Sequence, residues 1–171
     1  MKKIGFNDRY CLTQAVLEGR KTMTRRIEKS LDINHTRYKL GEIVAVAQSY
    51  NTIKSECKDN IPVWSNIVAN TCDGEHGCYN KMFVKPSLMP HQIQITGIRI
   101  ERLQDITDED CLREGIMKGK ALSMYTFHNA KLQYGSPRAA FSALIDKPGV
   151  GGKGTWQRNP FVVVYQFKLV K

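Results

Sequence analysis

The chain has 171 residues and a mass of 19.5 kDa, which is enough for one well-buried core and short for two. Apolar residues make up 42% of it, which argues against disorder over a large part of the chain. We therefore predict a single domain over residues 1–171. The formal net charge of +10 favours an anionic partner, such as nucleic acid, a nucleotide or an anionic membrane surface.

The charge is unevenly distributed along the chain. The first forty residues hold ten Lys or Arg against four Asp or Glu, whereas the stretch ERLQDITDEDCLREG, 101–115, is acidic. This asymmetry predicts a basic face with a local acidic site. A solvated basic surface that favours solubility explains the same net charge, so charge alone does not choose a partner.

The sequence shows no pattern of a membrane or secreted protein. No apolar run approaches the roughly 20 residues needed to span a bilayer, and the opening MKKIGFNDRY is too polar for a signal peptide. We expect a cytoplasmic protein with no membrane partner. Its five cysteines, an odd number at irregular spacing, favour reduced thiols over a disulfide framework.

The first part of the chain predicts one helix and two extended segments. Apolar residues recur at helical spacing over 8–18, and Gly19 occupies the position of a helix C-terminal glycine. The segment GRKTMTRR, 19–26, then enters an extended stretch. A run rich in Val and Ile, 42–50, predicts a buried strand.

The middle of the chain is less regular. Residues 51–80 mix polar residues and glycines with isolated large apolar ones, which predicts an insertion or a long loop carrying one short helix. Residues 81–104 predict two extended segments separated by prolines. In the second of these the isoleucines change parity around Gly97, as at a β-bulge or a bend in a barrel.

The last part of the chain predicts two helices and a closing strand. Thr107 has the character of an N-cap and Gly115 ends that helix, so Glu114 lies in its last turn, where the helix dipole disfavours a carboxylate. A second helix opens at Ser136, and residues 159–170 form the terminal strand. These are too few helices for a βαβ array. The predicted fold class is therefore α+β, a small mixed β-barrel with helices packed outside it.

The loop GVGGKG, 149–154, matches the dinucleotide pattern G-x-G-x-x-G only formally. It follows a predicted helix and leads towards a strand, whereas a dinucleotide loop needs the strand first so that helix amides meet the pyrophosphate. We predict instead that this segment is a loop that carries Lys153, Trp156 and Arg158 over a site.

Four soft metal ligands occur within or next to the sequence CDGEHGC. Cys72, His76 and Cys78 lie in it and Cys57 lies upstream, so together they could hold zinc. Their spacing is not that of a standard zinc knuckle. Free thiols in a surface insertion are the simpler interpretation, and no cofactor is expected.

The spacing Gly19-x-Lys21-x-x-Thr24-x-Arg26 resembles the G-x-K-x-x-T-x-R signature of the ASCH domain, a barrel-forming relative of the PUA RNA-binding fold. Segments similar to the family's core strands and helix follow in the same order: KLGEIVAVAQSY, NKMFVKPSLMPHQIQI, ERLQDITDEDCLREGI and WQRNPFVVVYQF. The resemblance implies a PUA-like barrel with flanking helices that binds RNA or handles a modified nucleoside.

The leading functional prediction is binding of RNA or a modified nucleoside in a cationic pocket. Lys21 and Arg26 would contact phosphate and Thr24 a base edge or sugar hydroxyl, while an aromatic side chain stacks on an unpaired base. The predicted ligand-binding residues are Gly19, Arg26, Tyr50, Lys81 and Trp156. A further alternative is an accessory module whose 51–80 insertion contacts another protein.

Catalysis is the second alternative that the resemblance implies. One small branch of the family hydrolyses the acetyl amide of N(4)-acetylcytidine with a lysine, a threonine and a glutamate, and Lys21, Thr24 and Glu114 match these by resemblance. Thr24 would attack the carbonyl, a neutral Lys21 would take its proton, and Glu114 would protonate the leaving nitrogen or position water. In a regular strand Lys21 and Thr24 face opposite sides, so the chain must bend between them.

Overall fold

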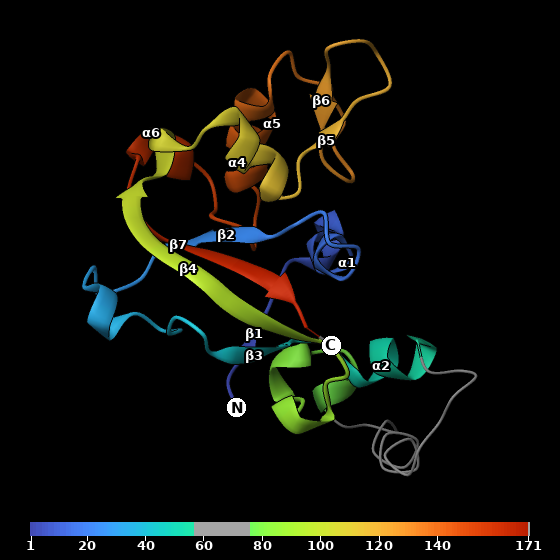
Figure 1. The fold of residues 1–171 in the computed structure, drawn as a ribbon. Helices are drawn as coiled ribbons and strands as arrows, with labels where there is room; N and C mark the ends of the chain where they lie inside the picture. The colour runs from blue at the N-terminus through green and yellow to red at the C-terminus, as the bar shows by residue number, and fades with distance from the viewer. Residues whose placement is uncertain (57–75, 171) are drawn as a thin grey trace. The chain divides into compact units, whose positions relative to one another are not determined.

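The computed structural model of the chain describes residues 1–56 and 76–170, which form two compact units (Figure 1). The first unit holds Met1–Phe6 and Ile43–Ile93 with the C-terminal end, and the second holds Asn7–Glu42 and Gln94–Leu169. The single domain expected for the whole chain stays a prediction, since compactness does not decide whether two units unfold together.

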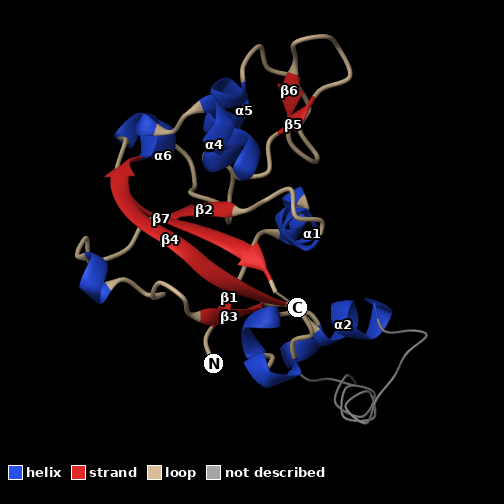
Figure 2. Ribbon diagram, viewed as in Figure 1, coloured by secondary structure: helices blue, strands red, loops and turns tan. Residues whose placement is uncertain are grey.

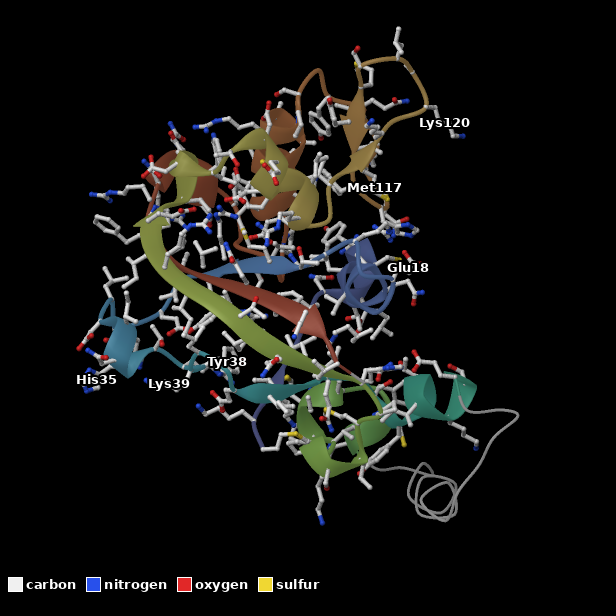
Figure 3. All side chains as sticks on the ribbon, in the orientation of Figure 1. Glu18, His35, Tyr38, Lys39, Met117 and Lys120 are labelled. Atoms are coloured by element: carbon white, nitrogen blue, oxygen red, sulfur yellow. The ribbon has the colours of Figure 1, made fainter. Side chains whose placement is uncertain are left out.

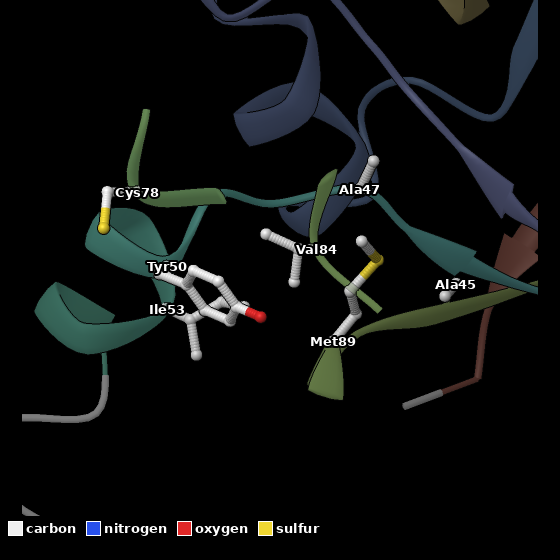
Figure 4. Close-up of a cluster of buried hydrophobic side chains, with 7 residues drawn as sticks. All are labelled: Ala45, Ala47, Tyr50, Ile53, Cys78, Val84 and Met89. Atoms are coloured by element: carbon white, nitrogen blue, oxygen red, sulfur yellow. The ribbon is translucent and has the colours of Figure 1, made fainter. Parts of the chain in front are cut away.

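Two short parallel strands and a helix are the regular elements of the first unit. β1 (Lys3–Ile4) pairs in parallel with β3 (Ile43–Val46), and α2 (Tyr50–Glu56) follows. Side chains from β3, α2 and the turns after residue 76 build a hydrophobic cluster (Figure 4). The members of this cluster are Ala45, Ala47, Tyr50, Ile53, Cys78, Val84 and Met89.

Three neighbouring strands form the sheet of the second unit. β2 (Met23–Arg26) pairs antiparallel with β7 (Phe161–Leu169), and Thr24 lies opposite Tyr165 in this register. β4 (Gln92–Arg102), which enters the second unit at its third residue, is the other neighbour of β7. Both faces of β7 are buried from Val162 to Tyr165, which explains its continuous apolar run.

Helices and a small hairpin complete the second unit (Figure 2). The helices are α1 (Leu12–Leu17), α4 (Asp108–Arg113), α5 (Pro137–Ile145) and α6 (Thr155–Arg158). The hairpin pairs β5 (Met117–Lys118) with β6 (Tyr125–Thr126). α4 packs against α5, and α5 also contacts α6 and β6.

The predicted helix ends are confirmed by the capping contacts. The Thr107 hydroxyl accepts a hydrogen bond from the Asp110 backbone N–H at 3.1 Å, and the Ser136 hydroxyl accepts one from the Ala139 N–H at 3.1 Å. Gly19 follows α1 with a φ of +73°, the left-handed conformation that glycine adopts without strain.

The prediction of an extended segment in the first part of 81–104 is wrong. Two 3-10 turns occupy it, at Lys81–Phe83 and Pro86–Leu88. The Asn80 side chain accepts a hydrogen bond from the Met82 backbone N–H at 3.0 Å. This local bond satisfies a backbone donor that a strand would have paired with a neighbouring strand.

The strand predicted over 42–50 is shorter than expected. β3 ends at Val46, and the Ser49 hydroxyl accepts the Thr52 backbone N–H at 3.2 Å, which is the contact of a helix N-cap. Tyr50 therefore begins a helix.

The described elements confirm a mixed α/β structure with both parallel and antiparallel strand pairs. Among the helices that the structure describes, none combines the length and the apolar character required to cross a bilayer.

Candidate functional site

A buried ion pair between Lys21 and Glu114 joins two segments of the second unit. Lys21 precedes β2, and Glu114 caps the C-terminus of α4. The Lys21 Nζ donates to Glu114 Oε2 at 2.5 Å and to the Glu114 backbone carbonyl at 2.8 Å. The two side chains are only 2% and 6% exposed. The ammonium also lies at the negative end of the helix, which offsets the cost of a carboxylate there.

Arg25 contacts Glu114 through its other carboxylate oxygen. Its Nη1 donates to Glu114 Oε1 at 3.2 Å, and its Nη2 donates to Asp110 Oδ2 at 2.7 Å and to Glu101 Oε1 at 2.6 Å. The sequence predicted no contact between Arg25 and a carboxylate. The only signal for Arg25 was its spacing of four from Lys21, which places both on the same side of an extended segment.

Arg99 completes a balanced group of charges around this pair. Its Nε donates to Glu101 Oε2 at 2.7 Å, and its Nη2 donates to Asp110. We call the group the Lys21–Glu114 cluster, and its members are Lys21, Arg25, Arg99, Glu101, Asp110 and Glu114. Arg113 adds a longer contact of 3.9 Å to Asp110 from a more exposed position. Among the six members themselves, three cations face three carboxylates, so the cluster has no excess positive charge. This balance favours an uncharged polar ligand over a phosphate at this place.

Burial sets the ionisation of the two central cations differently. Burial lowers the pKa of the Lys21 amine, although Glu114 beside it acts in the opposite direction. Burial also acts to lower the pKa of Arg25, but Glu114, Asp110 and Glu101 outweigh it and raise that pKa. Arg25 therefore keeps its charge, so Glu114 retains a cationic partner even when Lys21 is neutral.

Thr24 and Arg26 alternate with Arg25 along β2 and so project from the other side of the strand. Thr24 is buried, and its hydroxyl forms no hydrogen bond with any residue that the structure describes. Burial lowers the pKa of Arg26. The regular pairing of β2 runs through Thr24, so the structure does not bring its hydroxyl into hydrogen-bond contact with Lys21.

A second polar group, not predicted from the sequence, lies beside Thr24 because Tyr165 is its cross-strand partner. The Tyr165 hydroxyl donates to Glu28 Oε1 at 2.6 Å, and Glu28 Oε2 accepts the Arg37 backbone N–H at 3.0 Å. The Tyr165 and Tyr38 rings meet edge to face with centroids 5.2 Å apart, and Tyr38 is marked in Figure 3. Burial raises the pKa of both phenols, so both hydroxyls stay protonated and neutral.

Gly19 and Trp156, two predicted ligand residues, have structural partners in the second unit. Gly19 provides the turn that lets the chain leave α1 before Lys21, as expected. The Trp156 ring meets Phe141 edge to face with centroids 6.2 Å apart, and the Arg138 guanidinium lies 5.2 Å from its centre. Trp156 is half-buried, so part of its ring is still accessible.

Tyr50 and Lys81 belong to the first unit and contact other residues of that unit. Tyr50 is a member of the hydrophobic cluster, where Gly77 leaves room for its ring. The Lys81 ammonium donates to the backbone carbonyl of Phe6. Their role in ligand binding stays a prediction.

Half of the proposed zinc ligands cannot be placed, because Cys57 and Cys72 lie outside the described residues. Cys78 is buried in the hydrophobic cluster, and the His76 ring packs 5.3 Å from that of Phe83. Over residues 1–56 and 76–170, no three side chains of His, Cys, Asp or Glu are arranged to hold a metal ion. The described cysteines are free thiols: Cys11, Cys78 and Cys111.

Comparison with known proteins returns no relative of this chain. No protein-family model matches it, and neither a curated protein nor a solved structure does. The resemblance to the ASCH domain therefore depends on the signature and on the order of the segments around it.

Proposed function

We propose that the chain is an ASCH-type domain with a PUA-like barrel, and that it recognises a modified nucleoside at Lys21, Thr24 and Glu114. The observation that supports this most is the buried contact between Lys21 and Glu114. These residues are 93 positions apart in the chain and were singled out from the signature and from a helix end, yet their side chains meet at 2.5 Å.

The chemistry of the pair suits the edge of a nucleobase. A carboxylate accepts N–H groups, and an ammonium donates to carbonyl oxygens, so together they match an amide or an acylated exocyclic amine. Because both side chains are nearly fully buried, a nucleoside reaches them only when neighbouring side chains move. We therefore expect slow association compared with ligands of open sites.

Hydrolysis of an N-acylated cytidine is the second candidate function, and the lowered pKa of Lys21 favours it. A neutral Lys21 amine would take the proton of the Thr24 hydroxyl as its oxygen attacks the acyl carbon. The resulting ammonium would pass this proton through Glu114 to the exocyclic nitrogen as the C–N bond breaks, and water would then release acetate from Thr24.

The position of Thr24 is the demanding part of this mechanism. Its hydroxyl lies on the other side of β2 from Arg25 and is not hydrogen-bonded to Lys21. Substrate binding would have to draw the two together, as happens when catalytic hydrogen bonds tighten in an enzyme–substrate complex. Recognition without catalysis does not require the Thr24 hydroxyl to reach the Lys21 amine, and for this reason it is our first proposal.

A thermal-shift series with free nucleosides tests the first proposal. A ligand that binds only the folded chain raises Tm as its concentration increases. N(4)-acetylcytidine is expected to raise the Tm of the parent protein and of a Lys29→Met control, which removes an exposed cation of the same unit. The Glu114→Gln variant should show a much smaller rise. No shift in the parent at millimolar nucleoside would overturn the proposal.

Chromatography of the same mixtures tests the second candidate. Hydrolysis converts N(4)-acetylcytidine and water into cytidine and acetate, so cytidine should accumulate with the parent and not with Thr24→Val. Turnover should increase with pH and level off below 10.5, the ordinary pKa of lysine, because burial lowers the pKa of Lys21 and the neutral amine is the active form. Equal turnover by parent and Thr24→Val would rule out the threonine as nucleophile.

A further inference from the structure

One end of the second unit carries exposed cations beside an exposed aromatic ring. Arg102 ends β4 and Phe161 begins β7, and the Arg102 guanidinium lies 3.8 Å from the centre of the Phe161 ring. Phe161 is 42% exposed. Arg158 of α6 and Lys153 of the loop before it are also exposed. We call these four residues the Arg102–Phe161 surface.

Hydrogen bonds hold this surface in place. The Arg102 Nη1 donates to the Asn159 carbonyl at 3.2 Å, and the Gln104 backbone N–H donates to Asn159 Oδ1 at 2.9 Å. The Gln104 side chain also donates to the Trp156 carbonyl at 2.8 Å. These bonds connect α6 to the end of β4 and the residues that follow it, and Figure 1 shows α6 beside the end of that strand. A ligand that binds here meets groups that are already ordered, which reduces the entropic cost of binding.

The cations of this surface differ from those of the Lys21–Glu114 cluster. Arg158 donates to the Thr155 hydroxyl at 2.8 Å and to the Lys153 carbonyl at 3.1 Å, which are uncharged acceptors. Within the described part of the chain, no carboxylate forms an ion pair with Arg102, Lys153 or Arg158. The buried cluster is neutral in sum, so part of the excess charge of the chain is displayed here.

We propose that the Arg102–Phe161 surface binds single-stranded nucleic acid. An unpaired base would stack on the Phe161 ring or on the plane of the Arg102 guanidinium, while Arg158 and Lys153 bind phosphates. A duplex suits the surface less well, because its bases are already stacked on one another. The inference rests on the proposed function in one respect, that the bound nucleic acid would carry the recognised nucleoside. Binding of nucleic acid by the surface itself is measured separately.

Fluorescence anisotropy with labelled oligonucleotides tests this inference. The probes are single strands of about 12 nucleotides, oligouridylate and oligothymidylate, and a duplex of the same length. The parent protein is expected to bind the single strands more tightly than the duplex at low salt, and the affinity should fall as salt increases. The two single strands together show whether RNA, DNA or both are bound.

Three variants locate the binding. Lys153→Gln with Arg158→Gln should weaken binding about tenfold and reduce the slope of log K against log salt by about 1.4, the value for two phosphate contacts. Phe161→Leu should weaken binding about tenfold with little change of slope. The matched control, Lys118→Gln with Lys120→Gln, removes the same charge from the β5–β6 hairpin, where Figure 3 marks Lys120, and should bind as the parent does.

The oligonucleotide measurements can fail independently of the nucleoside measurements. Equal weakening in the two double variants, duplex binding as tight as single-strand binding, or no binding by the parent at low salt would each overturn the inference. A Lys21→Met protein that keeps oligonucleotide binding but loses the nucleoside-induced rise in Tm would support both proposals separately.

Discussion

Lys21 and Glu114 lie 93 positions apart in the sequence, and the ammonium of one donates to the carboxylate of the other at 2.5 Å inside the second unit. The contact fixes the start of β2 against the end of α4. It also brings together the two residues on which the proposed nucleoside site depends. Removing one partner of a buried pair lowers the free energy of unfolding, because the remaining charge stays in a poorly solvated place.

Lys21→Met is therefore expected to lower the free energy of unfolding by about 2 kcal/mol, somewhat less than for a pair with no other partner, because Arg25 still contacts Glu114. Urea denaturation measures the change. Lys29→Met, at an exposed position, should stay within about 0.5 kcal/mol of the parent. Equal stability of the two variants would show that the buried pair contributes little.

The N-cap of α4 determines where Glu114 lies. Thr107→Ala removes the acceptor of the Asp110 backbone N–H and should cost about 1 kcal/mol of unfolding free energy. Thr107→Ser keeps the hydroxyl and should restore most of that loss. If alanine and serine at this position gave the same denaturation midpoint, the cap would not be the cause.

Tyr165→Phe removes the hydrogen bond to the carboxylate of Glu28 and the acceptor of the Tyr38 backbone N–H at 3.4 Å, and it leaves the ring packing with Tyr38 in place. Hydrogen bonds to charged groups contribute more than neutral ones, so we expect a loss of about 1.5 kcal/mol in thermal or urea unfolding. The control is Tyr79→Phe, since Tyr79 is 90% exposed. A Tyr165→Phe protein as stable as this control would contradict the predicted strength of the bond.

The thiol of Cys111 should be inert in the folded protein. Burial raises its pKa from 9.0 to about 12, so at pH 8 almost no thiolate is present. Ellman's reagent should therefore titrate the same number of thiols in the native parent and in native Cys111→Ala, and one more thiol in the unfolded parent than in the unfolded variant. A slow extra thiol in the native parent, missing from the variant, would show that Cys111 is accessible.

The same raised pKa predicts a pH effect on stability. A thiol that is protonated more strongly in the folded chain than in the unfolded chain contributes stability fully below pH 9.0, and this contribution is lost as the pH rises towards about 12. The stability difference between the parent and Cys111→Ala should therefore shrink above pH 9. A constant difference between pH 8 and pH 10.5 would contradict the direction of the shift.

Local signals in the sequence predicted the helix ends well. Thr107, Ser136 and Gly19 act through neighbours within a few residues, so their residue types are sufficient to place a cap. The segment 81–104 was only partly predictable. Whether its first part forms a strand depends on a partner strand elsewhere in the chain, and the turn-forming contact of Asn80 prevailed.

The contacts around Glu114 were also only partly predictable from the sequence. The resemblance to a known signature assigned Lys21 and Glu114 to one site, but it did not predict the ion pair between them. The contacts of Arg25 were not expected, because its carboxylate partners come from segments that only the tertiary fold brings together. Those of Arg99 were also not expected, although Glu101 lies only two residues along the same strand. The unfavourable position of Glu114 at a helix end was the one local clue that it had a cationic partner.

Isothermal titration of the parent and of Lys21→Met with N(4)-acetylcytidine tests the central claim most directly, with Lys29→Met as the charge-matched control and cytidine as the second ligand. We predict saturable binding to the parent and to the control, with affinity for the acetylated nucleoside at least tenfold weaker in Lys21→Met. Identical binding curves for all three proteins, each confirmed to be folded by circular dichroism, would contradict a nucleoside site at Lys21 and Glu114.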